Sequence, residues 1–273
     1  MFKQEYINFF LSYGYFPKIA KQTVSLNSYD LDYNQYSLDE LSMKAYNLFI
    51  NNIDSLYRSN ELHLLPLSGG LDSRAILAGL LKCTEAKNIY AFTYGATGTL
   101  DYEIGKKIAT TVGVNHIAFE LQNYTYSLED LLYQSNSVRQ QTILFHTPPT
   151  EQIDILFKDF TVWSGILGDV VGGSAIPINP SPNLEAAKLM YIKNKIYLNK
   201  HIVKTPNKFI KLLLLNSINT NSGLSYDEKI IFTERFEKYY KPIIEFGTNK
   251  YYEPFLHNEF CDLMINSPLQ YRK

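Results

Sequence analysis

Short β-rich runs alternate with helical segments over residues 62–163, and this alternation restricts the fold more than any other feature. The predicted strands cover residues 62–67, 89–94, 115–119 and 160–163. The predicted helices between them cover residues 71–82, 101–112, 127–138 and 148–159. Such alternation is typical of crossover connections, so the sequence predicts an α/β fold with a parallel sheet covered by helices on both faces.

Segments on either side of this region set the expected domain organisation. Ser37 and Glu40 have the spacing of a capping box and predict a helix over residues 38–58. A proline-rich stretch at 177–182 then ends the alternation, and only helical patterns follow it. These later helices are expected at residues 183–198, 206–216, 226–240 and 256–266. The predicted parts are a lead-in segment at 1–36, an α/β domain at 37–176 and a helical subdomain at 177–273.

Composition excludes several classes of function. The 273 residues are 45% hydrophobic and carry a net charge of −1, so neither a nucleic acid nor a membrane is an expected partner. The two cysteines, Cys83 and Cys261, lie far apart and suit a reducing compartment. The start of the chain lacks the pattern of a signal peptide, and a cytoplasmic location is expected.

The segment Ser68-Gly69-Gly70-Leu71-Asp72-Ser73 joins a predicted strand to a predicted helix. Its glycines allow a tight turn, and the first amides of the helix form an anion site together with the helix dipole. The two serines add hydroxyl donors, and Asp72 offers the oxygen ligand that Mg²⁺ prefers. A diphosphate with its Mg²⁺ satisfies all of these groups. The alternative is a structural glycine-rich turn with a capping aspartate.

This segment is neither a Walker A loop nor a dinucleotide-binding G-x-G-x-x-G motif. It resembles the PP-loop of ATP pyrophosphatases, and within that superfamily the chain resembles the synthetase domain of asparagine synthetase. Further stretches resemble that family in the same order along the chain. They lie at residues 92–95, 101–103, 113–116, 163–173, 253–256 and 267–268. The resemblance implies a PP-loop, HUP-like (adenine nucleotide alpha hydrolase-like) sheet and a C-terminal helical subdomain.

The resemblance also implies roles for individual residues. Asp72 and Asp169 would hold Mg²⁺ and act in catalysis. The remaining ATP- and AMP-binding positions would be Leu67, Ser68, Gly69, Gly70, Ser73, Tyr94, Ser164 and Gly165. Each position has a plainer alternative: Asp169 as a helix-start residue, Ser164 and Gly165 as a strand-end turn.

Arg74 is equally consistent with a phosphate contact and with a solvated helix residue. The histidines at 116, 146 and 257 are interpreted as structural rather than catalytic.

The chain departs from the family pattern in several places. Phe2 follows Met1 where a glutaminase domain has its cysteine nucleophile, so the amine would be ammonia or another amine, with a separate glutaminase or completing subunit as a further partner. Ile166 and Leu167 replace a segment that bears a glutamate in the family, and His257 replaces an aspartate. The chain also stops at Lys273, before the position of the family's pyrophosphate-binding lysine, which leaves truncation of the subdomain open.

The expected function is therefore that of a ligase similar to asparagine synthetase. With ATP and Mg²⁺ it would activate a small-molecule or peptide carboxylate as an acyl-adenylate and pass the acyl group to an amine. Asparagine biosynthesis, modified sugars, peptide cyclisation and β-lactam closure are all open. The alternative is a degenerate synthetase that binds a nucleotide or a partner without catalysis. Other PP-loop reactions, such as tRNA thiolation and NAD or GMP synthesis, form a third class.

Overall fold

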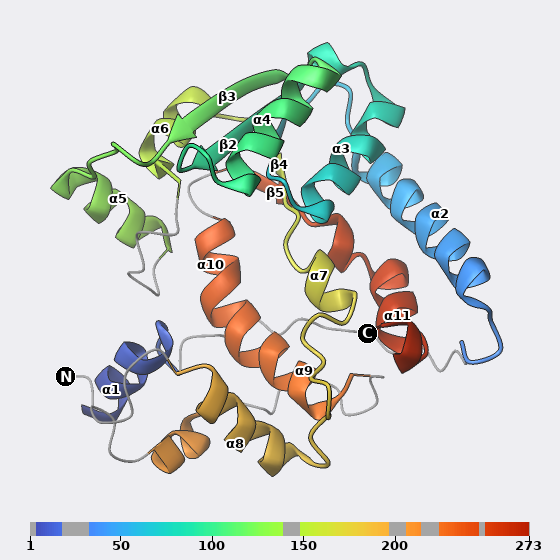
Figure 1. The fold of residues 1–273 in the computed structure, drawn as a ribbon. Helices are drawn as coiled ribbons and strands as arrows, with labels where there is room; N and C mark the ends of the chain where they lie inside the picture. The colour runs from blue at the N-terminus through green and yellow to red at the C-terminus, as the bar shows by residue number, and fades with distance from the viewer. Residues whose placement is uncertain are drawn as a thin grey trace.

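The computed structural model describes residues 4–17, 33–138, 148–196, 206–213, 224–245 and 249–272. Its centre is a sheet of five parallel strands in the order β3-β2-β1-β4-β5 (Figure 1). The strands are β1 (His63–Pro66), β2 (Ile89–Gly95), β3 (Asn115–Glu120), β4 (Thr161–Trp163) and β5 (Lys250–Tyr252). The four strands that the sequence predicts are present, and the α/β fold with a parallel sheet is confirmed.

Strand β5 is a correction to the sequence analysis, which expects only helices after residue 182. Lys250–Tyr252 pairs in parallel with Thr161–Trp163 of β4 and forms one edge of the sheet. The strand is three residues long, too short for a two-residue alternation to be recognised. Its β structure comes from pairing with a strand about ninety positions earlier, which no local pattern contains.

Alternating residues of the strands build two hydrophobic layers, one on each face of the sheet. Leu65 and Trp163 belong to the larger core, whereas their neighbours Leu64 and Val162 belong to a smaller one. The larger core is covered by α2 (Leu38–Leu56), α3 (Leu71–Cys83), α4 (Leu100–Val112) and α11 (Asn258–Asn266). The smaller core is covered by α6 (Thr150–Leu156), against which α5 (Leu128–Val138) packs. Helices therefore cover both faces of the sheet, as predicted, although the edge strand β3 stays largely exposed.

Local signals account for several helix ends. The Ser37 hydroxyl accepts from the Glu40 amide at 3.3 Å, and a Glu40 carboxylate oxygen accepts from the Ser37 amide at 2.8 Å, which is the predicted capping box. Gly113 ends α4 with a φ of 82°, a left-handed conformation that glycine adopts without strain. The predicted helix at 148–159 is shorter than expected and ends at Leu156. Asp159 has a φ of 67°, which is incompatible with its continuation.

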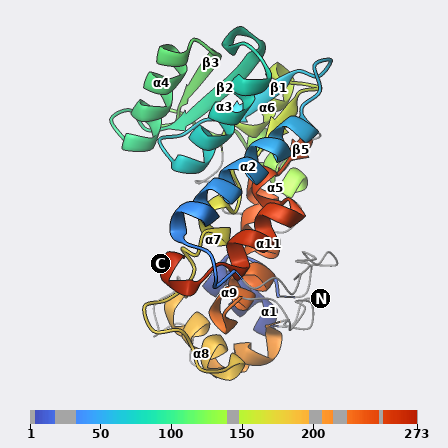
Figure 2. The same cartoon turned by 90° about the vertical axis from the view of Figure 1, so that its right-hand side faces the viewer.

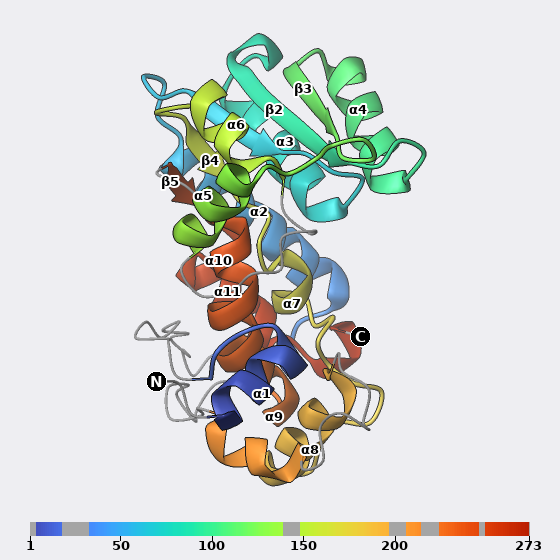
Figure 3. The same ribbon diagram turned by 90° about the vertical axis from the view of Figure 1, so that its left-hand side faces the viewer.

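A second group of helices lies on the far side of the molecule from β3 and β2 (Figures 2 and 3). It contains α1 (Gln4–Tyr13), α8 (Leu184–Asn194), the 3₁₀ helix η3 (Pro206–Leu212), α9 (Tyr226–Ile230), the π-helix η4 (Ile231–Tyr240) and α10 (Lys241–Ile244). Their shared core includes Phe9, Tyr13, Tyr191 and Tyr239. Helix α1 is absent from the predictions because its residues lack clear periodicity. Tertiary packing of its aromatic side chains stabilises it instead.

Four short helical segments complete the described chain. They are η1 (Ala86–Asn88), α7 (Gly168–Val171), η5 (Pro254–Leu256) and η6 (Leu269–Tyr271). The end of the helix predicted at 206–216 lies outside the described residues. None of the helices in the described part of the chain combines the length and apolar character needed to cross a bilayer.

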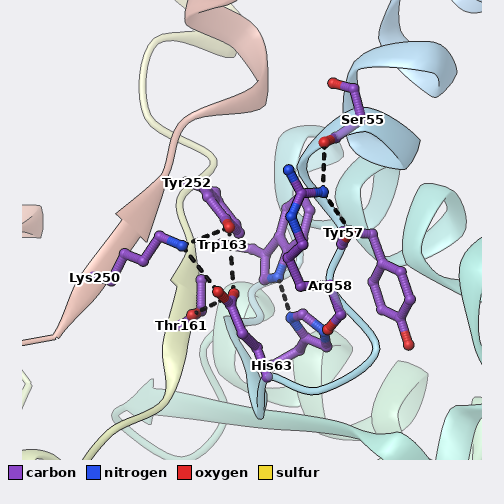
Figure 4. A network of polar contacts seen from close by, with 9 residues as sticks. Ser55, Tyr57, Arg58, His63, Thr161, Trp163, Lys250 and Tyr252 are labelled. Atoms are coloured by element: carbon purple, nitrogen blue, oxygen red, sulfur yellow. Dashed lines mark hydrogen bonds and ion pairs between the residues drawn. The ribbon is translucent and has the colours of Figure 1, made fainter.

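Glu61 ties together the beginnings of two strands at the amino-terminal edge of the sheet through Thr161 and Lys250, which Figure 4 labels. One of its carboxylate oxygens accepts from Thr161 Oγ1 at 2.9 Å, and the other pairs with Lys250 Nζ at 2.9 Å. Thr161 begins β4 and Lys250 begins β5. The carboxylate therefore reinforces a ladder that spans only three residue pairs.

A buried histidine joins β1 to β4 in the same network (Figure 4). Trp163 Nε1 donates to His63 Nδ1 at 3.0 Å, so the ring proton of His63 lies on Nε2. Nε2 then donates to the Arg58 carbonyl at 2.9 Å. Both ring nitrogens are satisfied only in the neutral form, and burial lowers the pKa of His63 below its ordinary value of 6.5. Because Trp163 directly precedes Ser164, this contact also fixes the start of the loop after β4.

We expect the stability of the protein to fall on acidification through His63. The folded state holds His63 neutral, so its contribution is complete above pH 6.5, the ordinary pKa, and is lost as the pH falls through the lower folded-state pKa. Chemical unfolding measured between about pH 5 and pH 7 should show this slope, and His63→Gln should flatten it. His257→Gln, at an exposed histidine, is the matched control and should keep the wild-type slope. An unchanged slope in His63→Gln would contradict the assignment.

Candidate functional site

The strand order places two loops side by side at the carboxyl-terminal edge of the sheet. Strand β1 lies between β2 and β4, and the chain leaves β1 towards β2 but leaves β4 towards β5. Such a reversal opens a crevice where parallel α/β sheets bind ligands. A cavity of about 960 Å³ lies there, and its wall includes residues of both loops.

The loop after β1 is held by its two serines. The Ser68 amide donates to Ser73 Oγ at 3.2 Å, and the Gly70 amide donates to Ser68 Oγ at 3.1 Å. Helix α3 then begins at Leu71 with no side-chain cap. The first four amides of a helix have no acceptor within it, so this terminus keeps the positive potential expected of an anion site. Ser68, Gly70, Asp72 and Ser73 all line the cavity.

Gly69 differs from the rest of the loop. Its amide donates to the Asp101 carbonyl at 3.0 Å, and the residue is not part of the cavity wall. A Cβ at this position would lie 3.2 Å from Asp101 and Ile104 of α4. The structure thus places Gly69 where the loop packs closely against α4, while its predicted role in nucleotide binding stays a prediction.

The loop after β4 returns to the first loop through a strained turn. Ser164 Oγ accepts from the Ile166 amide at 3.2 Å, which is the geometry of the strand-end turn considered above. Leu167 has a φ of 67°, a conformation that costs a residue with a Cβ about 1–2 kcal/mol. Helix α7 begins directly afterwards at Gly168. Ser164, Gly165 and Leu167 line the cavity.

The two loops meet at Asp72 and Asp169. The Asp169 amide donates to Asp72 Oδ2 at 3.2 Å, and both side chains line the cavity. Asp169 also behaves as a helix-start residue, since its Oδ1 accepts from the Val170 amide at 2.8 Å and its Oδ2 from Ser174 Oγ at 3.2 Å. Asp169 is therefore a helix-start residue, which is the plainer alternative given above, and it also lies beside Asp72.

Gly168 makes this approach possible. A Cβ on Gly168 would lie 2.5–2.7 Å from the carboxyl carbon and both oxygens of Asp72. Gly165, three residues earlier, is less restricted because its Cβ would lie at ordinary distances of 3.4 Å or more from Asp72 and Ser73. The need for glycine at 168 is thus a consequence of the packing of the second loop on Asp72.

The electrostatics of the aspartate pair suit a hard cation. Burial and the nearby Asp169 carboxylate raise the pKa of Asp72, although the hydrogen bond from the Asp169 amide opposes this. A cation between the two carboxylates would offset the repulsion between their negative charges. Within the described ranges no group of three or more histidine, cysteine or acidic residues could hold a metal ion. Two carboxylates fit Mg²⁺, which is commonly bound by one or two carboxylates plus water and phosphate oxygens.

The predicted adenosine-contacting residues line the same cavity from β1 and β2. Leu67 is fixed through its main chain, since its amide donates to the Phe92 carbonyl at 2.8 Å and its carbonyl accepts from Thr93 Oγ1 at 2.7 Å. Tyr94, two residues after Phe92 on β2, also lines the cavity. Tyr94 is 36% exposed, and its phenol can donate a hydrogen bond at neutral pH.

Other residues singled out from the sequence lie away from the cavity. Arg74 is exposed and its Nε donates to the Gly70 carbonyl at 3.1 Å. His116 Nε2 lies 2.9 Å from Thr93 Oγ1, which already donates to Leu67, so the histidine acts as donor in a structural contact. His257 is exposed at the start of α11. His146 and Lys273 lie outside the described residues.

The far wall of the cavity was not predicted from the sequence. This wall comes from the second group of helices and includes Met190, Tyr191, Asp227, Ile231, Arg235, Tyr240 and Ile244. Asp101, which sequence analysis treats only as part of an acidic stretch, lines the near part. No motif marks these positions, because they reach the cavity only through the packing of α8, α9 and η4.

Comparison with known proteins adds little to this geometry. No family model matches the chain, and no curated protein matches it. A solved structure of an NH₃-dependent NAD synthetase from Campylobacter jejuni is similar, with 13% identity and a TM-score of 0.30. The match covers 74% of this chain and 95% of that chain. At this identity and TM-score the likeness does not bear on activity, and the resemblance to asparagine synthetase stays a prediction.

We expect Gly168→Ala to destabilise the protein and to separate the two loops. The added Cβ overlaps the Asp72 carboxylate, so this side chain must turn away from the Asp169 amide or the loop must shift, at a cost near the lower end of the roughly 1–3 kcal/mol typical of overpacking. The free energy of unfolding from urea titration measures the effect. Gly165→Ala is the control in the same loop and should change stability less, because its Cβ meets neighbours at ordinary distances. Equal stability of the two variants would show that the loops do not pack as described.

Proposed function

We propose that the chain is an ATP-dependent amide-forming ligase. It would activate a carboxylate as an acyl-adenylate, release pyrophosphate and transfer the acyl group to an amine or ammonia. The observation that carries this proposal is the meeting of Asp72 and Asp169, from two different loops, beside an uncapped helix terminus in one cavity. Such a site offers anionic ligands for a cation and amide donors for phosphate within a single crevice.

Each group in the site has a defined task in this proposal. The first turn of α3 and the hydroxyls of Ser68 and Ser73 would bind the β- and γ-phosphates, which leave as pyrophosphate. Leu67, Tyr94, Ser164 and Gly165 would contact the adenosine part. Asp72 and Asp169 would hold Mg²⁺, which supplies positive charge to the phosphates. Preorganised donors of this kind stabilise the charge that develops on the phosphates as the carboxylate oxygen bonds to the α-phosphorus and pyrophosphate leaves.

The size of the cavity favours two ligands. Small-molecule sites range from about 300 to 1,000 Å³, and this cavity of about 960 Å³ lies near the upper limit. The groups that would bind phosphate lie on the side of the cavity formed by the loops of the sheet. The wall formed by α8 and η4 is left for the acid. Ile166 and Leu167 are buried and apolar where the family carries a glutamate. The proposal is therefore an amide-forming ligase without a commitment to aspartate, and a separate glutaminase or completing subunit remains part of it.

The same two residues support a second candidate function. With no carboxylate at positions 166 and 167, the site offers less acid–base chemistry than the family pattern implies. A nucleotide- or partner-binding module without catalysis would then be the role of the chain. In its nucleotide-binding form, this alternative predicts Mg-ATP binding with no exchange of pyrophosphate into ATP.

We expect the protein to bind Mg-ATP at millimolar concentration and to catalyse acid-dependent exchange of labelled pyrophosphate into ATP. Asp72→Asn and Asp169→Asn should each lower the exchange rate by about a hundredfold or more, because each removes a charge from the cation site. Calorimetric titration with Mg-ATP and the exchange assay measure the two effects separately.

Asp54→Asn, at an exposed aspartate of α2 away from the cavity, is the matched control and should behave like the wild type. Binding that persists in Asp72→Asn and Asp169→Asn, with no exchange in any protein, would select the binding module. A folded wild-type protein that binds no Mg-ATP would refute the ligase and the nucleotide-binding form of the module, leaving only the binding of a partner.

A further inference from the structure

Helix α7 begins beside the cavity at Gly168 and ends at Val171, where Arg272 contacts it. The carbonyls of residues 168–170 accept from the amides of residues 172–174, each at 3.0 Å. The Val171 carbonyl accepts instead from Arg272 Nη2, at the longer distance of 3.5 Å. Val171 is fully buried, so its carbonyl needs a donor from the protein. Arg272 therefore completes the hydrogen bonding at the end of the helix that carries Asp169.

The main chain of Arg272 packs closely on the turn that follows α7. Gly173 has a φ of 106°, a conformation that residues with a Cβ rarely adopt. A Cβ on Gly173 would overlap the Arg272 carbonyl oxygen. Helix α7 also packs on α11 (Figure 1), and Val171 and Ile265 belong to the same hydrophobic core. The position of α7 thus depends on residues that lie about a hundred positions later in the chain.

Arg272 also contacts two further helices. Its Nη2 forms an ion pair with Glu228 Oε1, and its Nη1 donates to the Ile265 carbonyl at 2.9 Å. Glu228 lies in the first turn of α9, and its Oε2 accepts from the amide and hydroxyl of Ser225 at 2.8 and 2.9 Å. Arg272 is 5% exposed and Glu228 is fully buried. These added hydrogen bonds are what a buried ion pair needs to offset its desolvation.

The ion pair therefore joins helices from opposite walls of the cavity. Asp169 of α7 lines the wall formed by the loops of the sheet, whereas Asp227 of α9 lines the far wall. Arg272 is not itself part of the cavity wall. Its effect on a ligand can therefore only be indirect, through the placement of α7 and α9.

We propose that Arg272 is a positioning residue, which together with Glu228 holds α7 so that Asp169 stays beside Asp72. The planar guanidinium has five donors and can serve two carbonyls and a carboxylate at once. The importance of this placement for a cation rests on the proposed function. Loss of the outer contacts that orient metal ligands typically lowers metal affinity by about 10–100-fold. The placement of α7 is itself measurable without a cation.

The double variant Arg272→Met with Glu228→Gln separates a positioning role from a purely structural one. It removes both charges, and glutamine keeps the capping box with Ser225. Replacement of a buried ion pair by uncharged side chains of similar size is often neutral for stability, so the variant should fold. Urea unfolding measures its stability. A purely structural role predicts that α7 and cation binding stay as in the wild type once the variant is folded.

Two measurements on the folded double variant test the placement of Asp169. Hydrogen exchange of the amides at 168–174, followed by mass spectrometry, should be faster by about tenfold or more, while the amides of β2 keep their wild-type rates. Mn²⁺ titrated alone and followed by electron paramagnetic resonance should bind about tenfold more weakly than to the wild type.

Arg58→Met is the matched control. Arg58 is exposed, lies outside the cavity wall, and its Nη1 donates to the carbonyls of Ser55 and Tyr57 at the end of α2. This variant also removes an arginine from carbonyls at a helix end, but it should leave both measurements at wild-type values.

Arg272→Lys decides the outcome if the double variant fails to fold. It keeps the charge next to Glu228 and loses the planar fork, so exchange at 168–174 should rise by severalfold. Wild-type exchange at 168–174 in the double variant, or in Arg272→Lys should the double variant not fold, would overturn the inference. Unchanged Mn²⁺ affinity in the folded double variant would overturn it as well.

Failure of the proposed function would look different. The wild type would then bind neither Mn²⁺ nor Mg-ATP, and the cation role of the two aspartates would be refuted. Faster exchange at 168–174 in the variants would still support Arg272 as the residue that holds α7, and wild-type exchange would still overturn it.

Discussion

The pairing of β1 with β4 is the constraint on which the site depends. These strands are about a hundred residues apart in the chain, and their register, His63 with Thr161 and Leu64 with Val162, brings the loops that follow them together. The buried hydrogen bond from Trp163, the last residue of β4, to His63, the first residue of β1, fixes the same pair. The contact between Asp72 and the Asp169 amide is a direct result, and Gly168 leaves the room that it needs.

The molecule combines two kinds of wall around one cavity. The sheet edge supplies short loops, amides and carboxylates, which suit phosphate and a cation. The helical group supplies a mixture of charged, aromatic and aliphatic side chains to the opposite wall. Strain is concentrated where the two meet: Leu167 takes a left-handed conformation directly before α7, and η4 is a π-helix. Both irregularities place side chains on the cavity wall, as is common at functional sites.

Sequence reasoning succeeded for features that neighbouring residues encode. The capping box at Ser37 is confirmed, as are the four strands of the α/β region. It failed for β5, whose three residues gain β structure from a distant partner. It also failed for α1, which aromatic packing stabilises rather than an amphipathic pattern. For the site, the predicted residues of both loops line the cavity except Gly69, while the far wall was not anticipated.

The sequence by itself determined where a strand, a glycine turn and a helix start follow one another, because hydrogen bonding and side-chain periodicity act over a few residues. It therefore located Asp72 and the loop around it. The tertiary structure decided which loop stands opposite: strand adjacency arises from burial of the whole sheet, which no local pattern specifies. It likewise decided that residues of η4 line the same cavity, because the packing of α8, α9 and η4 on one another sets which side chains face it.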